Sequence, residues 1–440
     1  MTHTITRRSA LKAAASALAV PMIFRSHTAS AKPSEAVRLM AVGAGGRGTN
    51  DIMEMAESPH FQLVAFADVD PARARDVIKK FPKAKVFTDW RKMFDEVKEV
   101  DAVSCSTPDH MHAPVAMTAL KLGKAVCCQK PLTHTLYEAR QLAKVSEEKK
   151  LVTQMGIQIH SHPVHKSVVH MIQDGVIGKV KEVHSWSGKD WGDRGPKPMK
   201  TDPVPKGLNW DGWLGVASER PFIGGGYYHP GNWRKRLDFG CGTFGDMGCH
   251  ILDPVFGSLG LTYPKSVRAS DGAPTEFHWG LDCVVKYVYP GTKFTTDELT
   301  LTWYDGKQRP GKDVAMLIGG KSFSDQGSVY IGTKGVMYSP YIANPVLFPT
   351  EEFKGYKYPD FKGDNHYSQF VEAVRGNGKN SAPFSYAGPL TELVLIGCLA
   401  TRFQNETLQW DSAAMKVKNL EAANHFVRKT YRKGWEVEGL

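Results

Sequence analysis

The stretch Gly43-Ala44-Gly45-Gly46-Arg47-Gly48 follows the apolar run 37–42 and precedes residues 50–56, which have the composition of a helix. The G-x-G-x-x-G spacing lets the chain turn tightly, approach a pyrophosphate with its backbone and pack a helix on a strand. A second apolar run, 61–67, ends at Asp68, where a carboxylate can accept hydrogen bonds from a ribose diol. We therefore predict a dinucleotide site, although a glycine turn that binds nothing has the same pattern.

Strands and helices continue to alternate after Asp68. We expect further strands over 84–87, 101–106, 124–128 and 151–156, separated by helices over 71–81, 90–98, 112–122 and 137–149. This alternation predicts a parallel sheet with helices on both faces, in which ligands bind at the carboxyl ends of the strands. The residues that we assign to cofactor binding are Gly43, Gly45, Gly46, Arg47, Gly48, Asp68, Thr107, Pro108, His112, Gln129 and Lys130.

The pattern changes beyond Gly156. We expect a helix over 160–174, a strand over 180–188, and antiparallel strands over 266–270, 283–289, 298–304, 328–332 and 335–338. Helices are expected over 365–375 and 389–403, the latter apolar enough to pack back onto the first domain. The fold class is thus α/β, with an N-terminal Rossmann dinucleotide-binding domain over 32–156 and a C-terminal α+β domain over 157–440 with a large, mostly antiparallel open sheet.

The segment 191–236 is long, irregular and rich in aromatic residues, glycine and proline. Aromatic rings stack on the apolar faces of sugar rings, so the segment favours a carbohydrate cleft, and a small core under the loop is the alternative. The residues that we assign to substrate binding are His160, Trp191, Tyr228, His229, Trp233 and Arg234.

A second polar motif lies in 238–253. If a helix begins near Gly245, Asp246 and His250 are i and i+4 and project from one face. His250 is then the candidate general base and Asp246 the carboxylate that orients it. The alternative is an aspartate that favours the helix dipole and a histidine satisfied in the core.

The chain has 440 residues, 42% of them hydrophobic, which is enough for two sizeable cores. Its net charge is +11, and it has no basic run, so nucleic acid is a poor choice of partner. A mildly basic surface favours anionic substrates or polysaccharides. The seven cysteines show no C-x-x-C spacing, so we predict no metal site.

Residues 1–31 have the features of a twin-arginine signal peptide. Thr6-Arg7-Arg8-Ser9-Ala10-Leu11-Lys12 is followed by a modestly apolar run, too short to span a bilayer, and by the A-x-A site Ala29-Ser30-Ala31. We therefore expect export to the periplasm or beyond. Removal of this segment would leave a net charge of +7.

Taken together, these motifs resemble the glucose-fructose oxidoreductase, inositol dehydrogenase and rhizopine-catabolism (Gfo/Idh/MocA) family. The resemblance rests on the glycine turn, on 67–70, on Thr107-Pro108-Asp109-His110-Met111-His112, on Gln129-Lys130-Pro131 and on 242–250. It implies that Lys130 matches the lysine of the E-K-P motif, that Asp246 and His250 match the D-x-x-x-H pair, and that the open sheet forms homo-oligomer contacts. Gln129 departs from the family's glutamate, so we expect a less stabilised ammonium at Lys130.

The expected activity is the oxidation of a sugar, polyol or glycoside hydroxyl. In this hypothesis His250 removes the proton, Lys130 stabilises the oxygen and Asp246 orients His250. Asp68 favours NAD over NADP, because its charge repels a 2′-phosphate. Outside the cytoplasm the cofactor must be retained and recycled. The alternatives are a redox-neutral NAD-dependent glycosidase that works through a transient keto-sugar and a non-catalytic carbohydrate-binding member of the fold.

Overall fold

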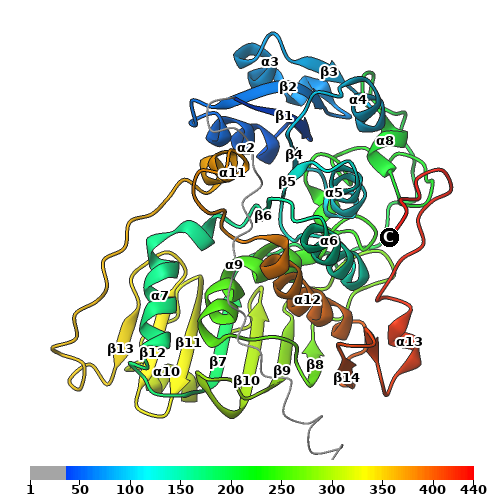
Figure 1. Cartoon of the computed structure of the whole chain (residues 1–440). Helices are drawn as coiled ribbons and strands as arrows, with labels where there is room; N and C mark the ends of the chain where they lie inside the picture. The colour runs from blue at the N-terminus through cyan, green and yellow to red at the C-terminus, as the bar shows by residue number, and fades with distance from the viewer. Residues whose placement is uncertain (1–35) are drawn as a thin grey trace, which may run out of the picture.

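Two β-sheets form the framework of residues 36–440, which are the residues that the computed structural model describes (Figure 1). The expected signal segment, 1–31, lies outside the described residues. Figure 1 shows the first sheet above the second, with α9 and α12 between them. No helix in the described part of the chain is long and apolar enough to cross a membrane.

The first sheet is parallel and has the strand order β3-β2-β1-β4-β5-β6. This is the Rossmann order, so the predicted class of the first domain is confirmed. Its strands are β1 (Val37–Val42), β2 (Phe61–Ala67), β3 (Lys85–Phe87), β4 (Ala102–Cys105), β5 (Ala125–Cys128) and β6 (Thr153–Met155). The accompanying helices are α2 (Arg47–Met55), α3 (Arg75–Lys80), α4 (Trp90–Glu96), α5 (His112–Lys121) and α6 (Leu136–Glu148), with short 3₁₀ helices η1 (Pro71–Arg73) and η2 (Asp109–Met111).

The second sheet has nine strands in the order β13-β12-β11-β7-β10-β9-β8-β14-β15. Strands β7 and β10 pair in parallel and the other pairs are antiparallel, so the predicted, mostly antiparallel sheet is confirmed. The strands are β7 (Val180–Ser187), β8 (Ser266–Asp271), β9 (Val284–Pro290), β10 (Thr295–Asp305), β11 (Gln326–Gly332), β12 (Val336–Pro340), β13 (Val346–Phe348), β14 (Thr407–Asp411) and β15 (Lys416–Val417).

The helices of this half are α7 (Pro163–Gln173), α8 (Trp210–Leu214), α9 (Gly242–Leu259), α10 (Lys312–Leu317), α11 (His366–Val374), α12 (Phe384–Ala400) and α13 (Glu421–Asn424), with η3 (Gln158–Ser161) and η4 (Asn232–Lys235). Two predicted starts were wrong. The helix expected from 160 begins at Pro163, after η3. The helix expected from Pro389 begins at Phe384, because proline is accommodated inside α12 rather than at its first turn.

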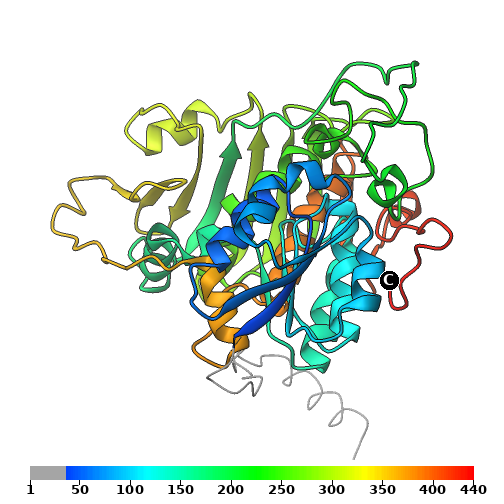
Figure 2. The ribbon, with the colours of Figure 1, turned by 90° about the horizontal axis from the view of Figure 1, so that it is seen from above.

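Helices α9 and α12 connect the two halves. Phe244 of α9 stacks on Trp303 of β10 with ring centroids 4.6 Å apart. Gly397 of α12 allows the close approach, because a Cβ there would lie 2.0 Å from the Tyr287 hydroxyl. Helix α12 also packs against α6 of the first half. The segment 349–365 then runs along the outside of the molecule to α11, which packs on α2 (Figures 1 and 2).

Candidate functional site

A cavity of about 230 Å³ lies at the carboxyl ends of β1, β2, β4 and β5, where the strand order reverses. Ligands of open α/β sheets bind at this position. The glycine turn and the loop after β4 form one wall of the cavity. Residues of the long loop 191–236 form the opposite wall, so the cavity lies between the two halves of the chain.

The glycine turn has the close contacts that its sequence predicts. Gly43 has φ +81°, and a Cβ there would lie 2.6 Å from the carbonyl oxygen of Ser106. A Cβ on Gly48 would lie 2.2 Å from the carbonyl oxygen of Gly43. Gly45 and Gly46 line the cavity at the start of α2. The turn can therefore bring backbone N–H groups and a helix N-terminus close to phosphates.

Asp68 lies at the end of β2 and lines the cavity. Its Oδ2 accepts hydrogen bonds from the N–H groups of Ala44 (2.8 Å) and Gly45 (2.9 Å), and its Oδ1 accepts one from Asp70 N–H. The carboxylate thus fixes the conformation of the glycine turn, in addition to the ribose-binding role that the sequence predicts for it.

Arg47 lines the cavity, but its guanidinium is paired along α2. Its Nε lies 2.7 Å from Asp51 Oδ1 and its Nη2 lies 3.4 Å from Glu54 Oε1. Its guanidinium carbon is 5.1 Å from the centre of the Tyr367 ring. A contact of Arg47 with a cofactor phosphate would therefore compete with these two carboxylates.

Gln129 belongs to a buried network around Asp51. Its Nε2 donates to Asp51 Oδ2 (2.8 Å) and to the Tyr367 hydroxyl (2.6 Å), while Ser106 Oγ donates to the same Oδ2 (2.7 Å). Burial raises the pKa of Asp51 above its ordinary value. A glutamate at 129 would place a second carboxylate against Asp51, which explains why an amide suits this position.

The loop after β4 is fastened to the turn that contains Lys130. The ring of His112 lies between two carbonyl oxygens, with Nδ1 2.8 Å from Pro131 O and Nε2 2.9 Å from Thr107 O. Thr107, Pro108 and His112 all line the cavity. His112 therefore connects the loop after β4 with the turn that contains Lys130.

Lys130, Asp246 and Arg234 form a buried group of alternating charge. Lys130 Nζ lies 2.5 Å from Asp246 Oδ1 and donates to the Asp246 carbonyl oxygen at 3.1 Å. Arg234 Nε lies 3.0 Å from the same Oδ1. Burial opposes ionisation of Asp246, but the two cations lower its pKa below the ordinary value. Lys130 thus has a counter-ion without a carboxylate at 129, contrary to the expectation drawn from Gln129.

His250 lies one turn after Asp246 on α9 and is buried. Among the described residues no hydrogen bond joins the two side chains, and Nδ1 of His250 has no partner. The structure thus does not pair Asp246 with His250, and Lys130 and Arg234 contact Oδ1 of the carboxylate instead. Burial and the charge of Lys130 lower the pKa of His250 to about 3, so its imidazole is neutral at neutral pH.

Tyr228 belongs to the small core of the long loop, where it packs on Trp213 and Phe239 and is only 2% exposed. Tyr228 thus fits the alternative of a small core under the loop, and it does not line the cavity. Trp191 is half-buried beneath Arg234, with 5.4 Å between the guanidinium carbon and the ring centre, and does not line the cavity.

Other predicted substrate residues of the loop do line the cavity. They are His229, Trp233 and Arg234. His229 Nε2 lies 2.9 Å from Asp70 Oδ2, which joins the loop to the end of β2. The remaining one, His160, lies outside the cavity lining and contacts Asp253 instead.

Sequence reasoning missed several cavity residues, among them Arg73, Asp109 and Trp213. Arg73 of η1 lies against the glycine turn, since a Cβ on Gly45 would be 2.8 Å from the Arg73 Cβ. Asp109 is buried and accepts a hydrogen bond from Cys241 N–H at the start of α9. Trp213 lines the cavity from the long loop. Asp109 carried a signal as a carboxylate in the loop after a buried strand, and Trp213 belongs to the aromatic-rich loop that the sequence singled out.

Comparison with known proteins assigns both halves to one family. The model described as oxidoreductase family, NAD-binding Rossmann fold, matches residues 37–157, and the model of that family's C-terminal alpha/beta domain matches residues 161–437. Levoglucosan dehydrogenase of Pseudarthrobacter phenanthrenivorans is 23% identical over 220 residues, 48% of each chain. Inositol 2-dehydrogenase of Rubrobacter xylanophilus is 35% identical over 162 residues, 35% of this chain and 44% of the relative. The chain thus spans about half the length of the curated relatives it matches.

Solved structures share the fold. The WlbA dehydrogenase from Bordetella pertussis, in complex with NADH and UDP-GlcNAcA, has a TM-score of 0.60 and 15% identity, with 86% of this chain and 99% of the other covered. An inositol dehydrogenase homologue from Azotobacter vinelandii, complexed with NADH and myo-inositol, has a TM-score of 0.56 and 17% identity, with 86% and 99% covered.

The network around Gln129 gives a stability prediction. We expect Gln129→Glu to lower the free energy of unfolding at pH 7 by roughly 2 kcal/mol, because it buries a second carboxylate beside Asp51. The pair must then hold a proton, so its pKa in the folded state lies above that of the unfolded chain. The defect should therefore be absent below about pH 4 and grow as the pH rises.

Urea unfolding from pH 4 to pH 8 measures this effect. Asp51→Asn combined with Gln129→Glu removes the like-charge contact and should recover much of the loss. An unfolding free energy of Gln129→Glu equal to that of the wild type at pH 8 would contradict the interpretation.

Proposed function

The chain belongs to the Gfo/Idh/MocA oxidoreductase family, and from this premise we propose that it oxidises a hydroxyl group of a sugar, polyol or glycoside with NAD. The observation that carries the proposal is the 2.5 Å contact of Lys130 Nζ with Asp246 Oδ1 beside the cavity that the glycine turn lines. The relatives named as levoglucosan and inositol dehydrogenases support the substrate class.

The residues at the cavity fit a dinucleotide. The glycine turn has no room for Cβ atoms at Gly43 and Gly48, and it joins directly to the N-terminus of α2. Asp68 disfavours the 2′-phosphate of NADP through its charge, which supports NAD. When bound, NAD supplies the hydride acceptor.

Lys130 and His250 perform the proton chemistry in this proposal. The Lys130 ammonium donates a hydrogen bond to the reacting oxygen of the substrate and stabilises the negative charge that develops there. The neutral imidazole of His250 accepts the hydroxyl proton. Asp246 balances the charges of Lys130 and Arg234. Its role in this proposal is therefore to position the Lys130 ammonium and not the His250 imidazole.

Replacing Lys130 tests the assignment. We expect Lys130→Ala to slow reduction of bound nucleotide by a sugar about 10²- to 10⁴-fold, because the substrate oxygen loses its stabilising donor. Nucleotide absorbance in single-turnover reactions gives the rate. Lys144→Ala, which removes an exposed lysine of α6, serves as the control. Equal rates for Lys130→Ala and the wild type would refute the assignment.

We also propose that the chain is exported through the twin-arginine signal at 6–12 and retains its NAD. Retention is supported by the position of the cavity between the glycine turn and the loop residues His229, Trp233 and Arg234, which line it from the other half of the chain. A retained cofactor must be reoxidised in place, by a second carbonyl substrate or by reduction of an intermediate of the same substrate.

Release of nucleotide from denatured, exported protein tests retention. We expect about one NAD per chain, and we expect one member of a sugar panel to convert it to NADH. For export, we expect the double substitution Arg7→Lys with Arg8→Lys to hold the protein in the cytoplasm. Dependence on a second carbonyl acceptor favours the oxidoreductase. Release of an aglycone without added NAD would indicate the redox-neutral glycosidase instead, and absorbance that no sugar changes would indicate a non-catalytic binding protein.

We further propose that copies of the chain associate through the second sheet. Helices α9 and α12 cover one face, and alternate side chains of β9 point away from them: Val284 and Val288 are half-buried and Lys286 is exposed. We expect light scattering to give a mass of at least twice that of one chain, and Val288→Arg to reduce it. A single-chain mass for the wild type would contradict this arrangement.

A further inference from the structure

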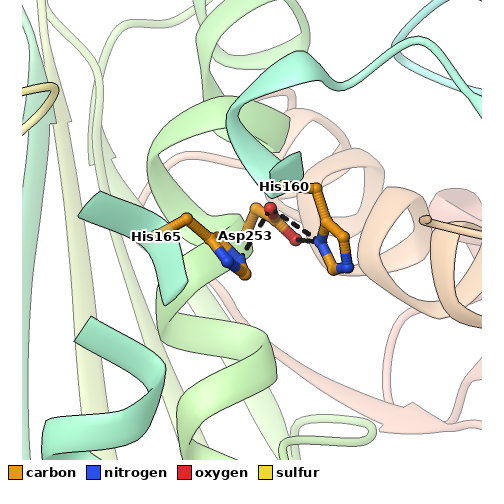
Figure 3. A group of neighbouring side chains, drawn as sticks. All are labelled: His160, His165 and Asp253. Atoms are coloured by element: carbon orange, nitrogen blue, oxygen red, sulfur yellow. Dashed lines mark hydrogen bonds and ion pairs between the residues drawn. The ribbon is translucent and has the colours of Figure 1, made fainter. Parts of the chain in front are cut away.

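A second group of polar side chains lies beyond His250 on α9. Asp253 of α9 is fully buried, His165 of α7 is 6% exposed and His160 of η3 is 22% exposed. Figure 3 shows the two imidazoles on either side of the carboxylate. His160 Nδ1 lies 3.1 Å from each Asp253 oxygen, and His165 Nε2 lies 3.0 Å from Oδ2.

His165 contacts the same carboxylate through a buried ring nitrogen. Its Nε2 lies 3.0 Å from Asp253 Oδ2, but the contact does not have the geometry of a hydrogen bond. A buried polar atom without an aligned hydrogen bond calls for an explanation. A cation bound by both the imidazole and the carboxylate would provide one.

The donor set suits a transition metal. Two imidazole nitrogens and one carboxylate oxygen are ligands that zinc accepts in three-residue sites with an open fourth position. The three ligand atoms lie within 4.8 Å of one another. Ligand atoms around a tetrahedral zinc ion are about 3.3 Å apart, so the group needs a closure of about 1.5 Å at most. The exposed edge of His160 gives an ion access from solvent.

The carboxylate is also held from outside the group. The Tyr386 hydroxyl of α12 donates to Asp253 Oδ1 at 2.5 Å, and its ring contacts His160 edge-on at 4.9 Å. Oδ2 remains directed at His165. Hydrogen bonds of this kind orient the carboxylate ligands of metal sites.

We propose that His160, His165 and Asp253 bind one divalent transition-metal ion, with zinc the ion that this donor set favours. The ion would join η3 and α7 to α9, three residues after His250, and so fix the helix that carries Asp246 and His250. The proposal does not rest on the proposed function. It replaces the expectation of no metal site, which was based on the spacing of the cysteines and did not include the histidines.

Isothermal titration of the chelator-treated, untagged chain with zinc chloride tests the site. We expect one tightly bound ion per wild-type chain and loss of this binding in His160→Ala with His165→Ala. Tyr386→Phe should weaken zinc binding about 10- to 100-fold, because it removes a hydrogen bond to a ligand. His170→Ala, an exposed histidine of the same α7, should bind zinc like the wild type.

Cobalt absorption provides a test that needs no variant. Co²⁺ added to the wild-type chain should give the intense visible bands of a four-coordinate nitrogen and oxygen site, and one equivalent of zinc should abolish them. Zinc binding no tighter in the wild type than in the double variant would overturn the proposal. A six-coordinate cobalt spectrum like that of the aqueous ion would also overturn it.

Discussion

The contact of one carboxylate with two cations joins three segments at the place where the two halves of this chain meet. Asp246 comes from α9, Lys130 from the end of the first sheet and Arg234 from the long loop, so three separate segments converge on one oxygen atom. Pairs of this kind add little net stability, because desolvation offsets the attraction between the charges. Removing one partner, however, leaves a charge uncompensated in a buried site. The group therefore acts mainly to fix geometry.

Several neighbouring features follow from that arrangement. With Asp246 engaged by the cations, Lys130 does not require a carboxylate at the preceding position, and Gln129 is free to satisfy Asp51 in a network that reaches α2 and Tyr367. Gln129 is thus accommodated without loss of the Lys130 counter-ion. Among the described residues the imidazole of His250 has no hydrogen bond to Asp246, and burial together with the charge of Lys130 keeps it neutral.

Local signals in the sequence predicted the fold better than they predicted the site. The strands of the first sheet were predicted to within a few residues, because a buried parallel strand is a continuous apolar run and the glycine turn has a fixed spacing. Short edge strands such as β13 and β15 contain too few residues for a periodic signal. The i, i+4 spacing of Asp246 and His250 indicated a shared helix face. It contained no information on Lys130 or Arg234, which approach Asp246 from distant segments.

The face of α9 gives one reason why these groups occur together. Asp246, His250 and Asp253 are spaced i, i+4 and i+7, so they lie in one line along the helix. Each side chain faces a different partner: two cations at the first, the edge of the Tyr341 ring at the second, and two imidazoles at the third. A shift or rotation of α9 would disturb all three contacts. The close packing of Phe244 on Trp303 and of α12 on α9 therefore holds the polar line in place, and the apolar core between the sheets positions the candidate site.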